Sequence, residues 1–127
     1  MTPDPCKLLV VDDNPQNRDL LIRRLTGSGY QVEVAEDGAE ALEKINQAHY
    51  DLVLLDQVMP GMSGLDLLRL LRATHSPSDL PVIMVSAVDN SEAIVDAFDL
   101  GANDYVVKPI KLDSLAAKVR KLVFPTG

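Results

Sequence analysis

The segment KLLVVDDNP, residues 7–15, contains the pattern that decides the fold. Its four consecutive apolar residues, Leu8 to Val11, have the length of a strand rather than of a helix. Two aspartates close this run. The next pair, Asn14 and Pro15, fits a helix N-cap followed by proline at the first helical position. Residues 7–15 therefore predict a buried strand that ends in carboxylates and leads directly into a helix.

Four more short apolar runs follow along the chain, each too short for a helix. They are Val32 with Val34, Leu52 to Leu55, Val82 to Val85, and Val106 with Val107. The runs at 8–11, 52–55 and 82–85 are continuous, which is typical of parallel strands covered on both faces. The run QVEVA, residues 31–35, alternates apolar and polar residues and therefore suits an edge strand.

Helical patterns follow each of these runs. In the first, Leu21 and Leu25 are four residues apart, and Gly27 and Gly29 end the helix. The others are marked by apolar residues at helical spacing: Ala41, Leu42 and Ile45; Leu67, Leu68 and Leu71; Ile94, Ala97 and Phe98, ending at Gly101; and Leu112, Leu115, Val119 and Leu122. The repeats predict an α/β fold, a doubly wound, five-stranded parallel sheet in a flavodoxin-like (βα)5 three-layer sandwich.

Length and composition predict one domain. The chain has 127 residues, of which 46% are hydrophobic, and this suffices for one packed core but not for two ordinary domains. We expect a single domain over residues 1–127 with its core at residues 7–122, and a tail at 123–127 that would suit the start of a linker.

The charge balance and the single cysteine exclude several classes of protein. With 12 Lys and Arg against 19 Asp and Glu, the net charge of −7 repels phosphate backbones and anionic lipid, so we expect no direct binding to nucleic acid or membranes. Cys6 alone can form neither a disulfide framework nor a zinc cluster, which favours a reducing compartment. The start MTPDPCK lacks a basic leader followed by an apolar stretch, and we expect a cytoplasmic protein.

The polar residues that follow the apolar runs form one candidate site. In an open α/β sheet, ligands bind outside the C-terminal ends of the strands. Each such residue alone could be a helix cap, a turn residue or a solvated side chain. Together they put three carboxylates, a hydroxyl and an ammonium at that end: Asp12, Asp13, Asp56, Ser86 and Lys108. Clustered carboxylates without His or Cys suit Mg²⁺, and the whole set suits a phosphoryl group with a carboxylate as covalent acceptor.

Four separated motifs carry a resemblance to a known family. They are Val10 to Asn14 (VVDDN), Leu55 to Pro60 (LDQVMP) with Gly64, Val85 to Ala87 (VSA), and Gly101 to Pro109 (GANDYVVKP). In this order they resemble the receiver domain of two-component response regulators, over nearly the whole chain.

The resemblance implies a role for each residue of the acceptor and metal site. Asp56 corresponds to the phosphoacceptor, and Asp12 and Asp13 correspond to the acidic pair that organises Mg²⁺, with Asp13 favoured as the direct ligand. The backbone carbonyl of Val58 completes the metal site. On the switch side, Ser86 corresponds to the switch hydroxyl and Tyr105 to the switch aromatic. Lys108 corresponds to the lysine that pairs with the phosphate, and the Lys108–Pro109 peptide bond is expected to be cis.

The resemblance also implies the partners and leaves two rivals to weigh. A sensor histidine kinase or a histidine phosphotransfer protein would donate the phosphoryl group. The surface formed by the fourth helix, the fifth strand and the fifth helix would then act on an output domain or effector. Homodimerisation on phosphorylation is left open. We expect a switch that assists its own phosphotransfer and dephosphorylation, not an enzyme. The rivals are a metal-dependent aspartyl-phosphate phosphatase, which Val58 disfavours because it cannot act as an acid, and an interaction module that is never phosphorylated.

Two further sets of residues carry expectations. The basic residues of the first and fifth helices are expected to form solvated faces, with a partner-docking surface on either helix as the alternative: Arg18, Arg23, Arg24, Lys118, Arg120 and Lys121. In receivers, the side chains two positions after the acceptor and two after the switch hydroxyl flank the path of the water that hydrolyses the aspartyl phosphate. Here they are Val58 and Val88, which cannot hydrogen-bond to water, so slow self-dephosphorylation is expected.

Overall fold

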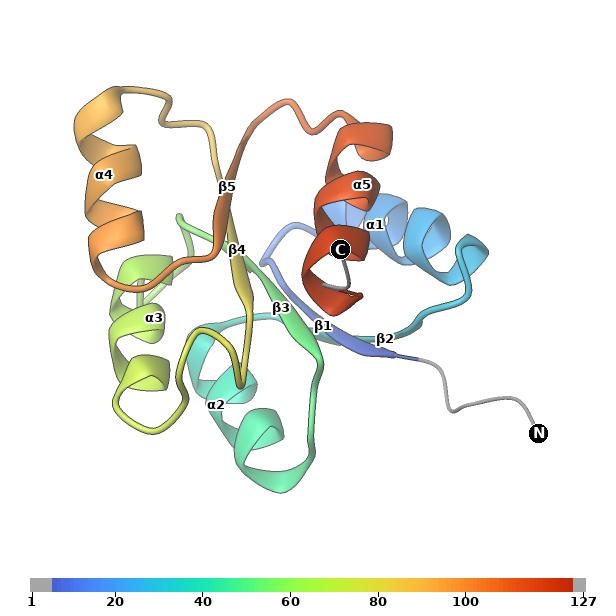
Figure 1. Ribbon diagram of the computed structural model, residues 1–127, viewed down its shortest axis with the longest axis horizontal. Coiled ribbons are helices and arrows are strands. Elements are labelled where there is room, and N and C mark those ends of the chain that lie inside the picture. The colour runs from blue at the N-terminus through green and yellow to red at the C-terminus, as the bar shows by residue number, and fades with distance from the viewer. Residues whose placement is uncertain (1–5, 125–127) are drawn as a thin grey trace.

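The computed structural model describes residues 6–124, in which strands and helices alternate along the chain (Figure 1). The strands are β1 (Lys7–Val11), β2 (Gln31–Ala35), β3 (Leu52–Asp56), β4 (Val82–Ser86) and β5 (Asp104–Val107). The helices are α1 (Pro15–Gly27), α2 (Gly38–Gln47), α3 (Gly64–Arg72), α4 (Ser91–Asp99) and α5 (Leu112–Val123). Within this described range, no helix is both long and apolar enough to cross a membrane.

The strands form one parallel sheet in the order β2-β1-β3-β4-β5. This confirms the predicted doubly wound sheet and places the alternating strand β2 at its edge, as expected. The inner strands β3 and β4 are buried at every residue. Because β1 and β3 are neighbours while the chain passes from them to opposite sides of the sheet, the C-terminal ends of these two strands form a topological switch point.

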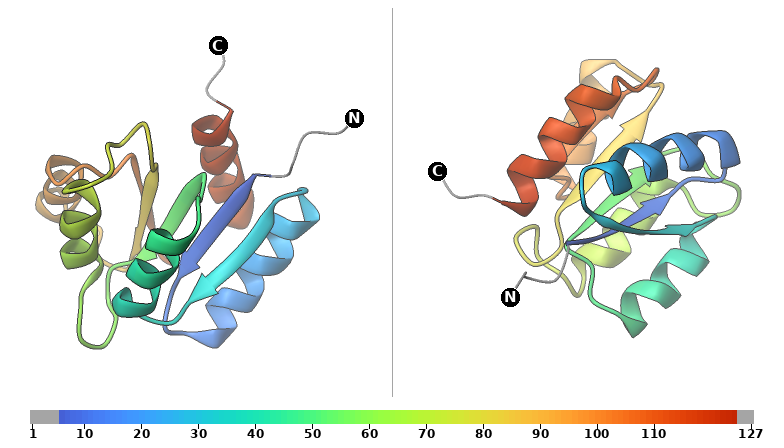
Figure 2. Two further views of the ribbon diagram at one scale, coloured as in Figure 1. Left: turned by 90° about the horizontal axis from the view of Figure 1, so that it is seen from below. Right: turned by 90° about the vertical axis from the view of Figure 1, so that its right-hand side faces the viewer.

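Helices cover both faces of the sheet (Figure 2). Alternate strand residues point to opposite faces, so Leu9 and Val11 pack with α2, α3 and α4, whereas Leu8 and Val10 pack with α1 and α5. The two resulting apolar clusters hold the sheet between them. The loops after each strand are therefore anchored on a rigid layer, which fixes the positions of the polar residues they carry.

N-cap residues in the sequence mark where helices begin after the C-terminal ends of the strands. The side chain of Asn14 accepts hydrogen bonds from the amides of Gln16 and Asn17, and Pro15 is the first residue of α1, as predicted. In α3, Ser63 and Asp66 form a capping box. Each cap satisfies amides at a helix start, so the chain can turn from a buried strand into a helix within a few residues.

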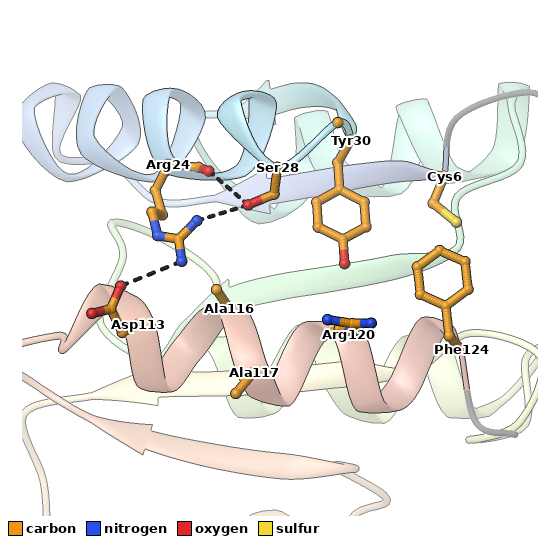
Figure 3. Close-up of a pocket in the computed structure, with 10 residues that line it drawn as sticks. Cys6, Arg24, Ser28, Tyr30, Asp113, Ala116, Ala117, Arg120 and Phe124 are labelled. Carbon is orange, nitrogen blue, oxygen red and sulfur yellow. Dashed lines mark hydrogen bonds and ion pairs between the residues drawn. The ribbon is translucent and has the colours of Figure 1, made fainter. Parts of the chain in front are cut away.

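A groove of about 720 Å³ runs between α1 and α5 (Figure 3). Arg24 crosses it, donating to Ser28 Oγ at 2.7 Å and approaching Asp113 at 3.3 Å. Cys6 and Phe124 line the other part of the groove. Since Cys6 precedes β1, this part of the groove lies at the N-terminal end of that strand.

Candidate functional site

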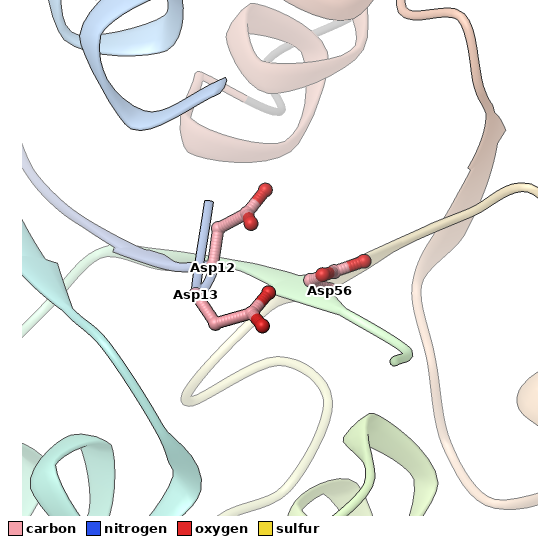
Figure 4. A group of neighbouring side chains, drawn as sticks. All are labelled: Asp12, Asp13 and Asp56. Atoms are coloured by element: carbon pink, nitrogen blue, oxygen red, sulfur yellow. The ribbon is translucent and has the colours of Figure 1, made fainter. Parts of the chain in front are cut away.

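Three aspartates meet at the C-terminal ends of β1 and β3. Asp12, Asp13 and Asp56, hereafter the acidic cluster, each contribute a carboxylate oxygen, and these oxygens lie within 4.8 Å of one another (Figure 4). Asp12 and Asp56 are buried, with exposed fractions of 2% and 4%, whereas Asp13 is exposed. The cluster therefore has a buried base and an opening toward solvent at Asp13.

Asp56 is the residue on which the charges of the site converge. The ammonium of Lys108 donates a hydrogen bond to Asp56 Oδ1 at 3.0 Å. Burial raises the pKa of Asp56 above its ordinary value, Asp12 and Asp13 raise it further, and Lys108 opposes these effects. Burial is the largest of these effects, and the pKa stays raised despite the hydrogen bond from Lys108.

The donors of the acidic cluster fit a hard divalent cation. Asn14 donates its N–H to Asp12 Oδ1 at 2.8 Å, and Lys108 occupies Asp56 Oδ1. Within residues 6–124, no protein group bonds to the other oxygen of either carboxylate, and none bonds to the side chain of Asp13. Carboxylate oxygens facing a solvent opening suit Mg²⁺, which binds through few carboxylates and retains several waters.

The predicted switch residues meet at one residue, Val88. Ser86 is 1% exposed, and its Oγ accepts the N–H of Val88 at 3.0 Å. The hydroxyl of Tyr105 donates to the carbonyl of Val88 at 2.6 Å. The amide of Lys108 donates to the carbonyl of Ser86 at 2.8 Å, so the ends of β4 and β5 are also tied together. Lys108 is joined to Pro109 by a cis peptide bond.

Gly64 sets how closely α3 approaches the end of β3. Its N–H donates to the carbonyl of Gln57 at 2.9 Å, and the side chain of Gln57 accepts the N–H of Leu65 at 2.8 Å. A Cβ atom on Gly64 would lie 2.5 Å from the carbonyl oxygen of Asp56 and 2.8 Å from the Cα of Gln57. Both are backbone atoms, so only glycine allows this packing. The sequence motif contained Gly64 but gave it no role.

The two valines expected beside the acceptor are both accessible. Val58, in the loop between β3 and α3, is 69% exposed, and Val88, in the loop between β4 and α4, is 40% exposed. Their loops follow Asp56 and Ser86 directly. That the backbone carbonyl of Val58 is a ligand of the metal stays a prediction.

The sequence did not predict the burial of Arg18 or its contact with the end of β1. Arg18 was expected on a solvated face, and this is wrong: its side chain is only 14% exposed, and its Nη1 donates to the carbonyl of Asp12 at 2.8 Å. Arg23, Arg120 and Lys121 are exposed, as expected. The available signal was the spacing of four residues between the N-cap Asn14 and Arg18, which puts Arg18 one turn into α1, close to the end of β1.

A small cavity of about 220 Å³ adjoins Lys108. Its lining comes from α1 and from the loop that follows β5: Asn17, Leu20, Leu21, Lys108, Pro109, Ile110 and Leu112. Leu20 is 53% exposed, which leaves apolar surface at the mouth of this cavity. A partner that approaches Asp56 from the C-terminal ends of the strands would meet this apolar surface.

Comparisons with known proteins agree with this geometry. The family described as response regulator receiver domain matches residues 8–120. Response regulator MprA of Mycobacterium sp. (strain KMS) is 43% identical over 123 residues, which are 97% of this chain and 53% of that protein. The DNA-binding response regulator MtrA of Mycolicibacterium smegmatis is 41% identical over 90% of this chain and 49% of its own length. The chain thus spans about half the length of these curated relatives.

Solved receiver structures match nearly the whole chain at somewhat lower sequence identity. The receiver domain of the Francisella response regulator 1452 superposes with a TM-score of 0.89 at 34% identity, covering 96% of this chain and 99% of that one. The response regulator TrrA from Thermotoga maritima, solved in complex with Mg²⁺-BeF, has a TM-score of 0.82 at 39% identity, covering 92% of this chain and 98% of that one.

Proposed function

The chain belongs to the response regulator receiver domain family, and from this premise we propose that Asp56 is the residue that accepts the phosphoryl group. A receiver domain of a response regulator acts as a signalling switch. The observation that carries the assignment is the position of Asp56: it is a buried carboxylate at the end of a central strand, between the acidic pair and the ammonium of Lys108.

The proposed reaction is transfer of a phosphoryl group from a phosphohistidine. An oxygen of the ionised Asp56 forms a bond to phosphorus while the bond from phosphorus to the donor imidazole nitrogen breaks. The electron pair of that bond stays on the imidazole, which takes up a proton. Lys108 already bonds to one Asp56 oxygen and would then pair with the oxygens of the phosphoryl group.

We propose that Asp12, Asp13, Asp56 and the carbonyl of Val58 hold Mg²⁺. Receiver domains generally bind Mg²⁺ at an acidic pocket, and the acidic cluster is such a pocket. When bound, the ion supplies positive charge that offsets the charge on the phosphoryl oxygens. The protein groups do the remaining work: Asp56 attacks, Lys108 neutralises charge and holds the Asp56 carboxylate, and the amide of Asn14 holds the Asp12 carboxylate.

The switch we propose runs from Ser86 to the surface of α4, β5 and α5. A phosphoryl group on Asp56 offers new acceptor oxygens to which the hydroxyl hydrogen of Ser86 can be donated, and a displacement of Ser86 Oγ toward them alters the bond that it accepts from the N–H of Val88. Tyr105 bonds to the same residue, so its position responds. Phosphorylation thereby favours one of two arrangements, which is a population shift.

The phosphoryl donor we propose is a sensor histidine kinase or a histidine phosphotransfer protein, docking at the cavity beside Lys108. The donor histidine must reach Asp56 from the C-terminal ends of the strands. The apolar residues that line the cavity, among them Leu20 and Ile110, flank that approach. An amphipathic helix that presents the histidine beside an apolar stripe would satisfy both requirements.

The output is proposed to lie in a partner protein or in a further domain. One curated relative is named a DNA-binding response regulator, and the relatives are about twice as long as the match. Residues 1–127 are proposed as one receiver domain that does not bind nucleic acid itself, because its net charge is −7. A cytoplasmic location and homodimerisation after phosphorylation remain part of the proposal.

Treatment with acetyl phosphate and Mg²⁺ tests the acceptor and separates the rivals. A stable adduct of one phosphoryl group per chain, measured by intact-protein mass, is the expected result. Asp56→Asn should lose it, whereas the control Asp79→Asn, at an exposed residue of the loop before β4, should keep it. Continuous phosphate release without an accumulated adduct would indicate a phosphatase. Absence of any adduct in the wild type would indicate a module that is never phosphorylated.

A further inference from the structure

Arg18 reaches from the first turns of α1 back to the end of β1. Its guanidinium Nη1 donates to the main-chain carbonyl of Asp12 at 2.8 Å, and only 14% of its side chain is exposed. The N–H of Arg18 itself donates to the carbonyl of Asn14, the N-cap of α1. The helix therefore fixes the point from which this guanidinium contacts the loop.

The Asp12 residue is held from three directions. Its N–H donates to the carbonyl of Ala35 at the end of β2 at 3.1 Å, its Oδ1 accepts the N–H of Asn14, and its carbonyl accepts Arg18. The carbonyl of Asp12 and the N–H of Asp13 belong to one planar peptide unit. The bond from Arg18 therefore fixes the plane from which the Asp13 side chain departs.

A surface ion pair does not account for this placement of Arg18. The only carboxylate within ion-pair distance of its guanidinium among residues 6–124 is Glu36, at 3.6 Å, and the Glu36 side chain is 68% exposed. Pairs of this kind contribute little, because water and salt screen them. The bond to the Asp12 carbonyl is shorter, partly buried and charge-assisted, and such bonds are the stronger class.

We infer that Arg18 is a positioning residue of the metal site, which fixes the Asp12–Asp13 peptide so that the acidic cluster is in place before a cation binds; this rests on the proposed function. Asp13 depends most on it. Its carboxylate is exposed and receives no hydrogen bond from residues 6–124, so its backbone alone orients it. Groups that hydrogen-bond to metal ligands and orient them have a large effect on the affinity for the metal.

The sign of the effect on Mg²⁺ separates positioning from simple electrostatics. Arg18 is a positive charge beside a site for a positive ion, so by Coulomb's law alone its removal would strengthen Mg²⁺ binding. If Arg18 orients the ligands, its removal weakens binding. The two roles therefore predict opposite changes in the Mg²⁺ dissociation constant.

The experiment is a Mg²⁺ titration followed by amide chemical shifts, for the wild type and three variants. Arg18→Met removes the donor and charge but keeps an unbranched chain, and it should weaken Mg²⁺ binding roughly tenfold. Arg18→Lys keeps the charge and loses the planar fork, so it should recover part of the affinity. Arg23→Met removes the same charge from an exposed position of α1, and its affinity should be unchanged or slightly higher.

A second measurement needs no metal. In the metal-free protein, the Arg18→Met variant should shift the amide signals of Asp13 and Asn14 and increase their hydrogen exchange, whereas Arg23→Met should not. Mg²⁺ binding in Arg18→Met as tight as in Arg23→Met overturns the inference while leaving the proposed function intact. If the wild type binds no Mg²⁺, the proposed metal site and the inference both fail. If Arg18→Met does not fold, Arg18→Ala, which also removes the donor, takes its place, and an unchanged Mg²⁺ affinity in it overturns the inference.

Discussion

Ser86 and Tyr105 hold the same residue from two sides, because Val88 donates its N–H to Ser86 Oγ at 3.0 Å and accepts the Tyr105 hydroxyl at its carbonyl at 2.6 Å. The two side chains come from different strands, β4 and β5. Val88 lies two residues before Asn90, the N-cap of α4. A movement of Ser86 toward Asp56 therefore reaches both α4 and β5 through one residue.

Tyr105→Phe tests this link. The substitution keeps the ring and removes one hydrogen bond, whose net contribution is about 1 kcal/mol. If that bond favours the unphosphorylated arrangement, its loss should increase the population of the phosphorylated-like arrangement about fivefold and increase hydrogen exchange at residues 87–90. Amide exchange and chemical shifts of the unphosphorylated protein measure both effects. Tyr30→Phe, whose hydroxyl makes no hydrogen bond within residues 6–124, is the control. Equal exchange in the two variants would contradict the prediction.

Lys108→Ala should separate phosphorylation from switching. Asp56 and the acidic cluster remain, so the variant should still accept phosphate, but the ammonium that we propose couples the phosphoryl group to β5 is gone. We expect the phosphorylation-dependent amide shifts of α4 and α5 to be lost. Lys111→Ala, at an exposed residue before α5, should retain them. Wild-type shifts in phosphorylated Lys108→Ala would show that the lysine does not transmit the signal.

Gly64→Ala should disturb Asp56 through its backbone. The new methyl group would lie 2.5 Å from the Asp56 carbonyl oxygen, so α3 must move away, at a cost of about 1–3 kcal/mol of unfolding free energy. Phosphorylation by acetyl phosphate should slow as well. In Gly27→Ala the added Cβ meets no atom within 4 Å, and neither stability nor phosphorylation should decrease. Denaturant unfolding and phosphorylation time courses give the two comparisons.

Asp56→Asn should stabilise the metal-free protein at neutral pH. Burial raises the folded-state pKa of Asp56, so the ionised carboxylate destabilises the fold above that pKa. The penalty disappears as pH falls below the ordinary pKa of an aspartate, where the carboxyl is protonated in both states. The gain in Tm from Asp56→Asn, measured in chelator, should thus be present at pH 7 and vanish at acid pH. A gain that grows toward acid pH would mean that the pKa is shifted the other way.

Val58→Asn with Val88→Glu should shorten the life of the aspartyl phosphate. Both valines are accessible and flank the expected path of the attacking water, which they cannot bind. Polar groups that align this water and lower the activation free energy of hydrolysis by about 1.4 kcal/mol would accelerate hydrolysis roughly tenfold. Phosphate release at equal Mg²⁺ measures the rate. Leu70→Asn, at an exposed apolar residue of α3, controls for the added polarity, and an unchanged lifetime in the double variant would exclude control by the valines.

The sequence by itself determined the sheet and the residues at its C-terminal ends. Continuous apolar runs identified the covered strands, and alternation in QVEVA identified the edge strand β2. Both are local patterns, set by which faces of a strand are buried. Because parallel strands end on the same side, the residue after each run was enough to assemble Asp12, Asp56, Ser86 and Lys108 into one candidate site.

Only the tertiary structure decided how those residues are held. The bond from Arg18 to the Asp12 carbonyl, the two bonds to Val88, and the approach of Gly64 to Asp56 each join groups from different elements or loops. None has a sequence period, because each depends on the path of a loop and on the rotamer of one side chain. Hydrophobic patterning places elements to within a residue or two, whereas a hydrogen bond requires its atoms to be placed to a few tenths of an ångström.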